Sequence, residues 1–107
     1  MKTIVLLENN KSMKIPRKVV HSKQLGDFVV VLTDSDEGYK INNENVYGYD
    51  VNGNELWQIE DLNLFHEEHD YTGIYIKDSD LYLYNRCGVE VKINAETGKI
   101  LSKELIR

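Results

Sequence analysis

The chain has 107 residues, of which 41% are hydrophobic, and a formal net charge of −5. This length predicts one domain, residues 1–107, with a single core. The first apolar run covers only residues 4–7, whereas a secretory signal needs roughly 7–15 apolar residues and a membrane span needs roughly 20. The lone Cys87 cannot form a disulfide within the chain. We therefore expect a cytoplasmic protein that does not interact with membranes.

Short segments rich in Val, Ile and Tyr recur along the chain and are separated by Asn, Asp and Gly. This pattern is typical of strands joined in hairpins. In chain order the segments are 3–7, 18–21, 28–33, 45–50, 73–78, 80–85, 89–94 and 99–105. The sequence therefore predicts an all-β fold. We expect an antiparallel meander of about eight strands that forms a small sandwich or an open, propeller-like pair of sheets.

Local signals predict the connections between these strands. Asn52-Gly53 predicts a two-residue hairpin turn with positive φ at both positions, and we expect Gly88 and Gly98 to have comparable roles. The region 61–69 instead has apolar residues at helical spacing after an Asp that can cap a helix. We expect at most one short helix there, of one or two turns.

An internal repeat relates residues 36–59, approximately, to residues 71–94 at an offset of 35. The register is unbroken across both predicted turns, which favours a true repeat over a chance similarity of hairpins. Side chains two apart on a strand share one face, so each copy places two tyrosines on one side of its sheet. A second layer of strands can cover them, or they can contact a partner. The aligned tyrosines are Tyr47 with Tyr82 and Tyr49 with Tyr84.

Residues 46–57, VYGYDVNGNELW, carry a Tyr-x-x-Asp strand, a glycine turn and a Leu-Trp on the returning strand. This segment resembles the outer hairpin of quinoprotein-type (PQQ-like) β-propeller repeats. Residues 93–101, INAETGKIL, resemble the same turn with its Thr-Gly-Lys. The resemblance implies hairpin geometry only, because a closed propeller needs four or more four-stranded blades and this chain has strands for about two. It also lacks recognisable residues for the quinone cofactor, so we expect no cofactor.

Residues 66–70, HEEHD, are the strongest candidate for a metal site or an active site. A zinc-protease helix has the pattern His-Glu-x-x-His, whereas His66 and His69 are three residues apart. A catalytic zinc also needs a third ligand and an open coordination position, and no residue is placed for either role. We therefore predict that the protein binds no metal, has no catalytic residues and is not an enzyme.

Charge is distributed unevenly along the chain. Residues 34–70 carry eleven acidic side chains against one lysine, while residues 1–33 carry six basic side chains against two acidic ones. An acidic block disfavours nucleic acid as a partner and suits a basic protein, although it can also serve only solubility. A tryptophan nearby can be a buried anchor or an interface hot spot. The candidate partner-binding residues are Asp34, Asp36, Glu37, Trp57, Glu60, Asp61, Glu67, Glu68 and Asp70.

Two functional classes fit these observations. The first is a small acidic protein that occupies a basic partner, as an immunity protein does with a nuclease toxin. The second is a structural or accessory β-module that self-associates through exposed sheet edges, and the oligomeric state is left open. For the first class, the repeat predicts that the loops around 34–37 and 60–70 converge. We expect Glu67, Glu68 and Asp70 to be unnecessary for folding.

Overall fold

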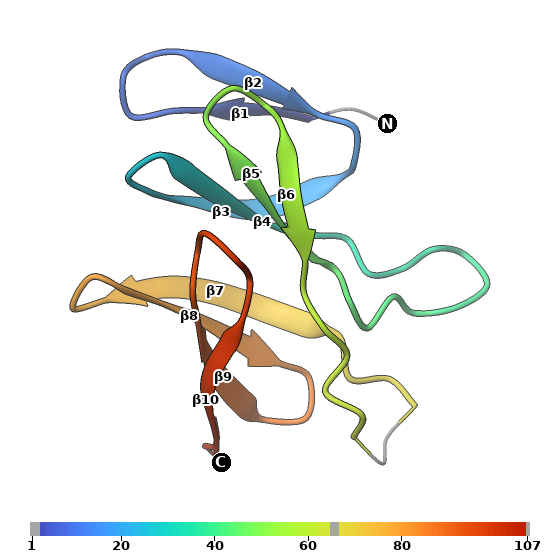
Figure 1. Ribbon diagram of the computed structural model, residues 1–107. Coiled ribbons are helices and arrows are strands. Elements are labelled where there is room, and N and C mark those ends of the chain that lie inside the picture. Colours follow the sequence, from blue (N-terminus) through green and yellow to red (C-terminus); the bar gives the residue numbers. More distant parts are fainter. Residues whose placement is uncertain (1–2, 65–66, 107) are drawn as a thin grey trace.

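The computed structural model describes residues 3–64 and 67–106, and these residues form ten strands in three antiparallel sheets (Figure 1). The all-β fold predicted from the sequence is confirmed. The strands are β1 (Thr3–Leu6), β2 (Ser12–Ile15), β3 (Val19–Leu25), β4 (Phe28–Thr33), β5 (Val46–Asp50), β6 (Glu55–Gln58), β7 (Tyr71–Lys77), β8 (Asp80–Asn85), β9 (Val89–Ile93) and β10 (Ile100–Leu105).

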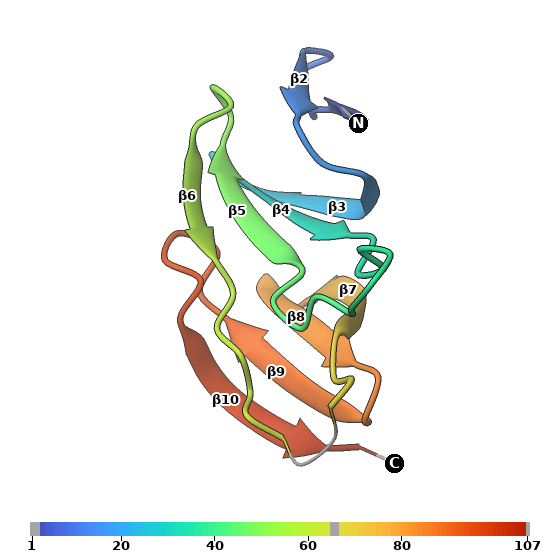
Figure 2. The same cartoon turned by 90° about the vertical axis from the view of Figure 1, so that its right-hand side faces the viewer.

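Strands that are consecutive in the chain are neighbours within each sheet. A two-stranded hairpin, β1–β2, is followed by two four-stranded meanders, β3-β4-β5-β6 and β7-β8-β9-β10 (Figure 2). Of the ten strands, periodicity did not predict β2 and β6. Each has only four residues. β2 alternates fully between exposed and buried positions but is too short to stand out, and β6 has no buried residue.

The first meander is the middle layer of three, and its two faces belong to different hydrophobic clusters. Val29 and Val31 of β4 pack with the buried face of the β1–β2 hairpin. Val30 and Leu32 point to the opposite face and pack against the second meander. The run "VVVLT" in β4 is therefore almost wholly buried, as expected for a strand covered on both sides.

The two tyrosine pairs have different surroundings. Tyr47 and Tyr49 on β5 are buried beneath the β1–β2 hairpin. On β8, Tyr82 stacks on Tyr75 with ring centroids 5.2 Å apart, and Tyr84 is exposed. The offset of 35 residues aligns β5, the third strand of its meander, with β8, the second strand of its own. A layer of strands thus covers one pair and leaves the other open.

The hairpin turns depend on glycine at one position. The φ angles of Gly53 and Gly88 are 91° and 84°, as expected. The prediction of positive φ at Asn52 is wrong, because the backbone N–H of Asp50 bonds the carbonyl of Asn54 and leaves a three-residue loop. In such loops a type I turn is followed by one residue in the left-handed region, which is Gly53 here.

The expected helix at 61–69 is absent from the residues that the structure describes in this region. Asn63 has a φ of 53°, outside the helical range, and its backbone N–H donates to Asp61 Oδ1 across 2.6 Å. Asp61 therefore closes a turn rather than capping a helix. Phe65, which completed the expected helical face, lies outside the described residues. No helix capable of crossing a membrane occurs in residues 3–64 and 67–106.

Trp57 on β6 joins the two four-stranded meanders. Its indole Nε1 donates a hydrogen bond of 2.8 Å to the carbonyl of Ala95, in the loop before β10. A Cβ atom added to Gly48 would lie 2.1 Å from the ring, and one added to Gly98 would lie 2.4 Å from it. The ring is therefore held between two backbone segments that only glycine allows so close. Of the two roles considered from the sequence, this geometry is that of an anchor.

The contact between Gly48 and Trp57 predicts a difference between two glycine substitutions. Gly48→Ala places a methyl group inside the Trp57 ring, and we expect a loss of about 1–3 kcal/mol in the free energy of unfolding. Gly73→Ala is the matched control, because its Cβ meets the nearest atom, in Tyr84, at an ordinary 3.6 Å. Urea denaturation measures both. Equal effects would show that the Trp57 contact does not limit stability.

Candidate functional site: the acidic loop pair

Two long loops lie at the same end of the molecule (Figure 1). Loop 34–45 connects β4 to β5, and loop 59–70 connects β6 to β7. Asn43 links them, since its Nδ2 donates to the carbonyl of Glu67 and its Oδ1 accepts from the backbone N–H of His69, both at 2.8 Å. We call these loops the acidic loop pair. Their convergence agrees with the expectation from the sequence.

Asn45 fixes the base of both loops. Its side chain is buried, with 1% exposure, and donates to the carbonyls of Thr33 at 3.0 Å and Tyr71 at 2.9 Å. Its Oδ1 accepts from the backbone N–H of Tyr71 at 2.9 Å. One amide thus joins the end of β4 and the start of β7, which are the points where the first loop begins and the second ends.

Asp70 lies inside this assembly and not on its surface. Its carboxylate is 2% exposed and accepts hydrogen bonds from Ser35 Oγ at 2.5 Å and Arg86 Nε at 2.6 Å. Burial alone would raise the pKa of Asp70, but the bonds from Arg86 and Ser35 outweigh burial and lower that pKa below its usual range. Removing one member of a buried ion pair leaves the other charge without its partner, which is destabilising. The contacts of Asp70 therefore lead us to expect, unlike the sequence alone, that its replacement weakens the fold.

Asp34, at the start of loop 34–45, is also partly neutralised. Its Oδ2 lies 3.2 Å from Lys18 Nζ, and its Oδ1 accepts from the backbone N–H of Asp36. The hydrogen bond from Asp36 and then the ion pair with Lys18 lower the pKa of Asp34. Asp36 and Glu37 follow it, and both are exposed. The exposed acids of this loop are therefore Asp36 and Glu37 towards its tip and Glu44 near its end at β5.

In loop 59–70 the acids also differ in their surroundings. Asp61 Oδ1 lies 2.6 Å from Nε2 of His69, whose side chain is buried. The hydrogen bond with His69, and then that from the backbone N–H of Asn63, lower the pKa of Asp61. Glu60, Glu67 and Glu68 are exposed. The exposed acids of the loop pair are Asp36, Glu37, Glu44, Glu60, Glu67 and Glu68.

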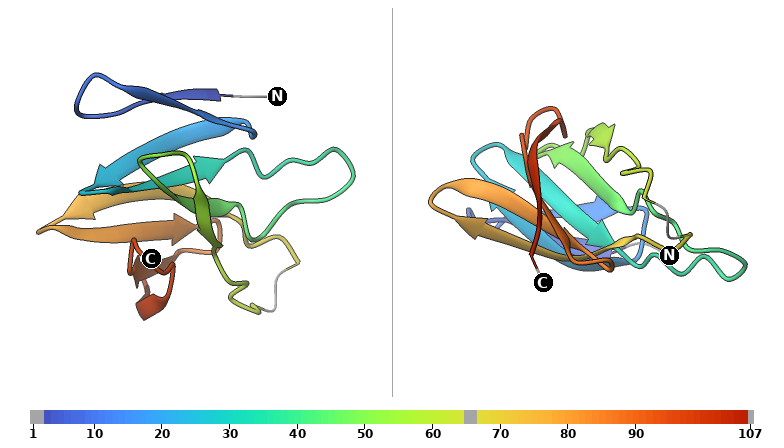
Figure 3. Two further views of the ribbon diagram at one scale, coloured as in Figure 1. Left: turned by 45° about the horizontal axis from the view of Figure 1, so that its top comes forward. Right: turned by 90° about the horizontal axis from the view of Figure 1, so that it is seen from below.

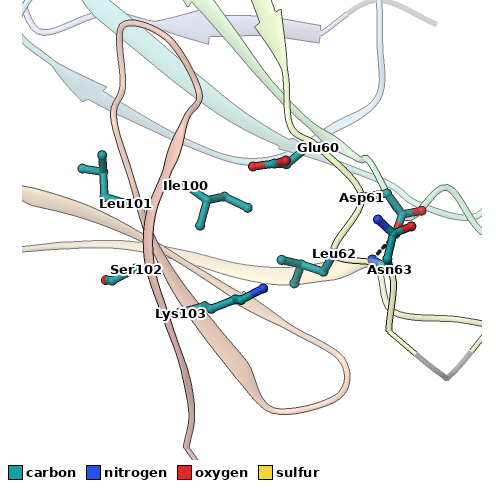
Figure 4. A pocket seen from close by; sticks show the side chains of 8 residues that line it. All are labelled: Glu60, Asp61, Leu62, Asn63, Ile100, Leu101, Ser102 and Lys103. Atoms are coloured by element: carbon teal, nitrogen blue, oxygen red, sulfur yellow. Dashed lines mark hydrogen bonds between the residues drawn. The ribbon is translucent and has the colours of Figure 1, made fainter.

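A shallow groove of about 380 Å³ borders the loop pair (Figure 4). Residues 60–63 form one wall and residues 100–103 of β10 form the other. Figure 4 shows Glu60 and Leu62 pointing towards β10, and Ile100 and Lys103 pointing back towards them. The groove combines charged and apolar walls.

The HEEHD segment is only partly described, because His66 lies outside the described residues. Its other histidine, His69, is engaged with Asp61. Within residues 3–64 and 67–106, no group of three or more His, Cys, Asp or Glu side chains is placed to hold a metal ion. The expectation that the protein binds no metal stays a prediction.

Two residues of the acidic loop pair, Asn45 and Tyr39, were not predicted from the sequence. Asn45 resembles the other loop asparagines in sequence, so its buried role carries no local signal. Tyr39 is 83% exposed at the tip of loop 34–45. The run "DEGYK" could have indicated it, since a single aromatic residue stands there among charged residues and glycine.

Comparison with known families gives one match. Residues 2–105 match a family described as "Domain of unknown function (DUF7957)". The chain belongs to this family. No characterised protein matches the chain, and no solved structure matches it. The resemblance to quinoprotein-type repeats stays an expectation.

The Asp70 contacts predict a pH-dependent stability. Because the pKa of Asp70 is lower in the folded chain than its ordinary value of about 3.9, its contacts stabilise the protein above about pH 4 and are lost as the pH falls through the folded pKa. Asp70→Asn should therefore lower the free energy of unfolding at pH 7 by roughly 1–3 kcal/mol. The difference from the parent should shrink below about pH 4.

Glu67→Gln is the matched control for this prediction, because it removes the same charge from an exposed position in the same loop. We expect it to leave stability unchanged at both pH values. Thermal unfolding followed by circular dichroism across the pH range measures all three proteins. If Asp70→Asn and Glu67→Gln behaved alike, the Asp70 contacts would not stabilise the fold.

Proposed function

We propose that this protein is a small acidic cytoplasmic binding protein that occupies a basic protein partner through the acidic loop pair. Inhibition of a cationic nuclease toxin, as by an immunity protein, is the form of this function that we favour. The observation that supports it is the link between the loops through Asn43 and Asn45, which gathers exposed carboxylates from two distant segments at one end of the protein. The role is binding and not catalysis.

Electrostatics explains how such a surface would act. Carboxylates gathered within a Debye length, about 8–10 Å at cellular salt, reinforce one another and attract a cationic surface before contact. Three acids of the region already have cationic or histidine partners within the chain, namely Asp34, Asp61 and Asp70. The six exposed acids are therefore the ones available to a partner. The same field would repel nucleic acid.

The hydrogen bonds within the loop pair also support a binding role. A loop that is already ordered loses less conformational entropy when it binds than a flexible one does. Loop 34–45 is held by Asn45 at its base and by the Ser35–Asp70 bond along its side. The loop pair would thus offer the partner a surface close to its bound shape.

Self-association through a sheet edge is our second proposal, and one observation weighs against it. β10 is an edge strand of the second meander, and its Lys103, which pairs with Val91, is exposed in the groove beside residues 60–63. A charged side chain on an edge strand opposes pairing with another strand, because a strand added at that edge would take its ammonium group partly out of water. We therefore place this function below partner binding.

The proposed function predicts a charge-dependent association rate. The variant Glu67→Gln/Glu68→Gln should associate with the basic protein captured from native-cell extract roughly 3- to 10-fold more slowly than the parent at low salt. The difference should disappear at high salt, where the charges are screened. Stopped-flow or surface plasmon resonance measures the rate.

The matched control is Glu8→Gln/Glu96→Gln, which removes the same charge from exposed positions outside the loop pair. We expect it to associate nearly as fast as the parent. Equal slowing by both double variants would mean that net charge, and not the loop pair, controls association. If the immobilised parent captured no basic protein in a salt-sensitive way, the proposed function would be wrong.

A further inference from the structure

The tip of loop 34–45 presents an aromatic side chain to solvent. Tyr39 is 83% exposed, the highest exposure of any large hydrophobic residue in the described chain. The Lys40 ammonium lies 5.6 Å from its ring centroid. A tyrosine held this far out of the core contributes little to folding, because it removes almost no apolar surface from water.

The segment that carries Tyr39 is a small hairpin with its own hydrogen bonds. Asp36 and Ile41 form an isolated antiparallel bridge, and the backbone N–H of Glu37 donates to the carbonyl of Lys40 at 3.1 Å. Gly38 has a φ of 88°, a conformation that favours glycine, and its N–H donates to Asp36 Oδ1. We call residues 36–41 the Tyr39 hairpin.

The Tyr39 hairpin is braced at its base and extends away from the sheets. The backbone N–H of Asn42 donates to the carbonyl of Ser35 at 2.8 Å, and Ser35 Oγ is bonded to the buried Asp70. Both views of Figure 3 show the loop projecting well beyond the three layers. Tyr39 therefore lies on a hairpin that projects from the protein and is held at its base by hydrogen bonds. Such a projection fits a recess in a partner better than it fits a flat surface.

We propose that Tyr39 is the anchor residue of the partner interface and inserts into a cationic cleft of the basic partner. This inference rests on the proposed function and adds the kind of surface that the partner presents. Exposed Tyr side chains are frequent hot spots, because a large rigid ring buries much area with little loss of entropy. Asp36 and Glu37 precede Tyr39 in the same hairpin, and both are exposed. They would contact Lys or Arg side chains at the mouth of the cleft.

The chemistry of the Tyr39 hairpin also indicates what the cleft normally holds. The hairpin carries a planar ring and the exposed carboxylates of Asp36 and Glu37, with the Lys40 ammonium 5.6 Å from the ring centroid. A ring and anionic groups are the two features that a single-stranded nucleic acid presents, as a stacking base and its phosphates. Clefts for single strands combine a basic groove with aromatic or guanidinium faces. The Tyr39 hairpin would occupy such a cleft in place of the nucleic acid.

The experiment combines cross-linking with kinetics. Benzoylphenylalanine, a photoreactive phenylalanine, replaces Tyr39 in one protein and Tyr84 in a control; Tyr84 is exposed on β8, outside the acidic loop pair. Each is illuminated in native-cell extract, and cross-linked peptides are mapped by mass spectrometry. The cross-linked basic protein is then purified, and its binding is measured with the parent, Tyr39→Ala, Tyr84→Ala and Glu67→Gln/Glu68→Gln. A thymidine homopolymer serves as competitor.

We expect position 39, and not position 84, to cross-link to a segment rich in Lys or Arg. Tyr39→Ala should dissociate roughly 10- to 100-fold faster than the parent with little change in association rate, since an anchor acts after encounter. Tyr84→Ala should behave like the parent, and the thymidine homopolymer should compete with the parent for the partner.

Different outcomes would overturn the inference and the function separately. If Tyr39→Ala dissociated like the parent while Glu67→Gln/Glu68→Gln still slowed association, the loop pair would bind without Tyr39 as its anchor. Failure of the homopolymer to compete would exclude a nucleic-acid cleft. If no basic protein were captured, or if both Gln substitutions left association unchanged, the proposed function and this inference would both be wrong.

Discussion

The positions of the two meanders and of loops 34–45 and 59–70 depend on the hydrogen bonds of the Asn45 side chain. Three hydrogen bonds join it to Thr33 and Tyr71, at the ends of strands from different meanders. A buried amide loses its bonds to water on folding, so its partners inside the protein must replace them. Because those partners lie at the bases of two loops, satisfying one side chain also sets where loops 34–45 and 59–70 leave the sheets.

Trp57 supplies the corresponding contact at another place between the meanders. Its ring is held between Gly48 and Gly98, and its indole N–H bonds to Ala95. The meanders are thus joined by a specific polar contact at Asn45, a specific aromatic contact at Trp57 and the hydrophobic cluster that they share. These contacts between the meanders do not involve Tyr39 or the exposed acids of the loop pair.

The acidic charge is tolerated because it is divided between two environments. Asp34, Asp61 and Asp70 have partners that lower the pKa of each, which favours the anionic form of these side chains. The other acids of the loop pair are exposed, where water screens their mutual repulsion. Sequence reasoning treated Asp70 like Glu67 and Glu68, because charge and position along the chain do not indicate burial.

The sequence by itself determined the features that depend on near neighbours. Alternation of apolar residues indicated the β class, and Gly53 and Gly88 marked turns, because strand period and turn φ are local properties. Only the tertiary structure decided which loop residues are structural. A helix was expected at 61–69, but Asp61 instead closes a turn and contacts His69. Asp70 is buried and accepts hydrogen bonds from Ser35 and Arg86. Ser35 and Arg86 are distant from Asp70 in the chain, and the Asp61–His69 contact spans eight residues of a loop. Local periodicity carries no information about either kind of contact.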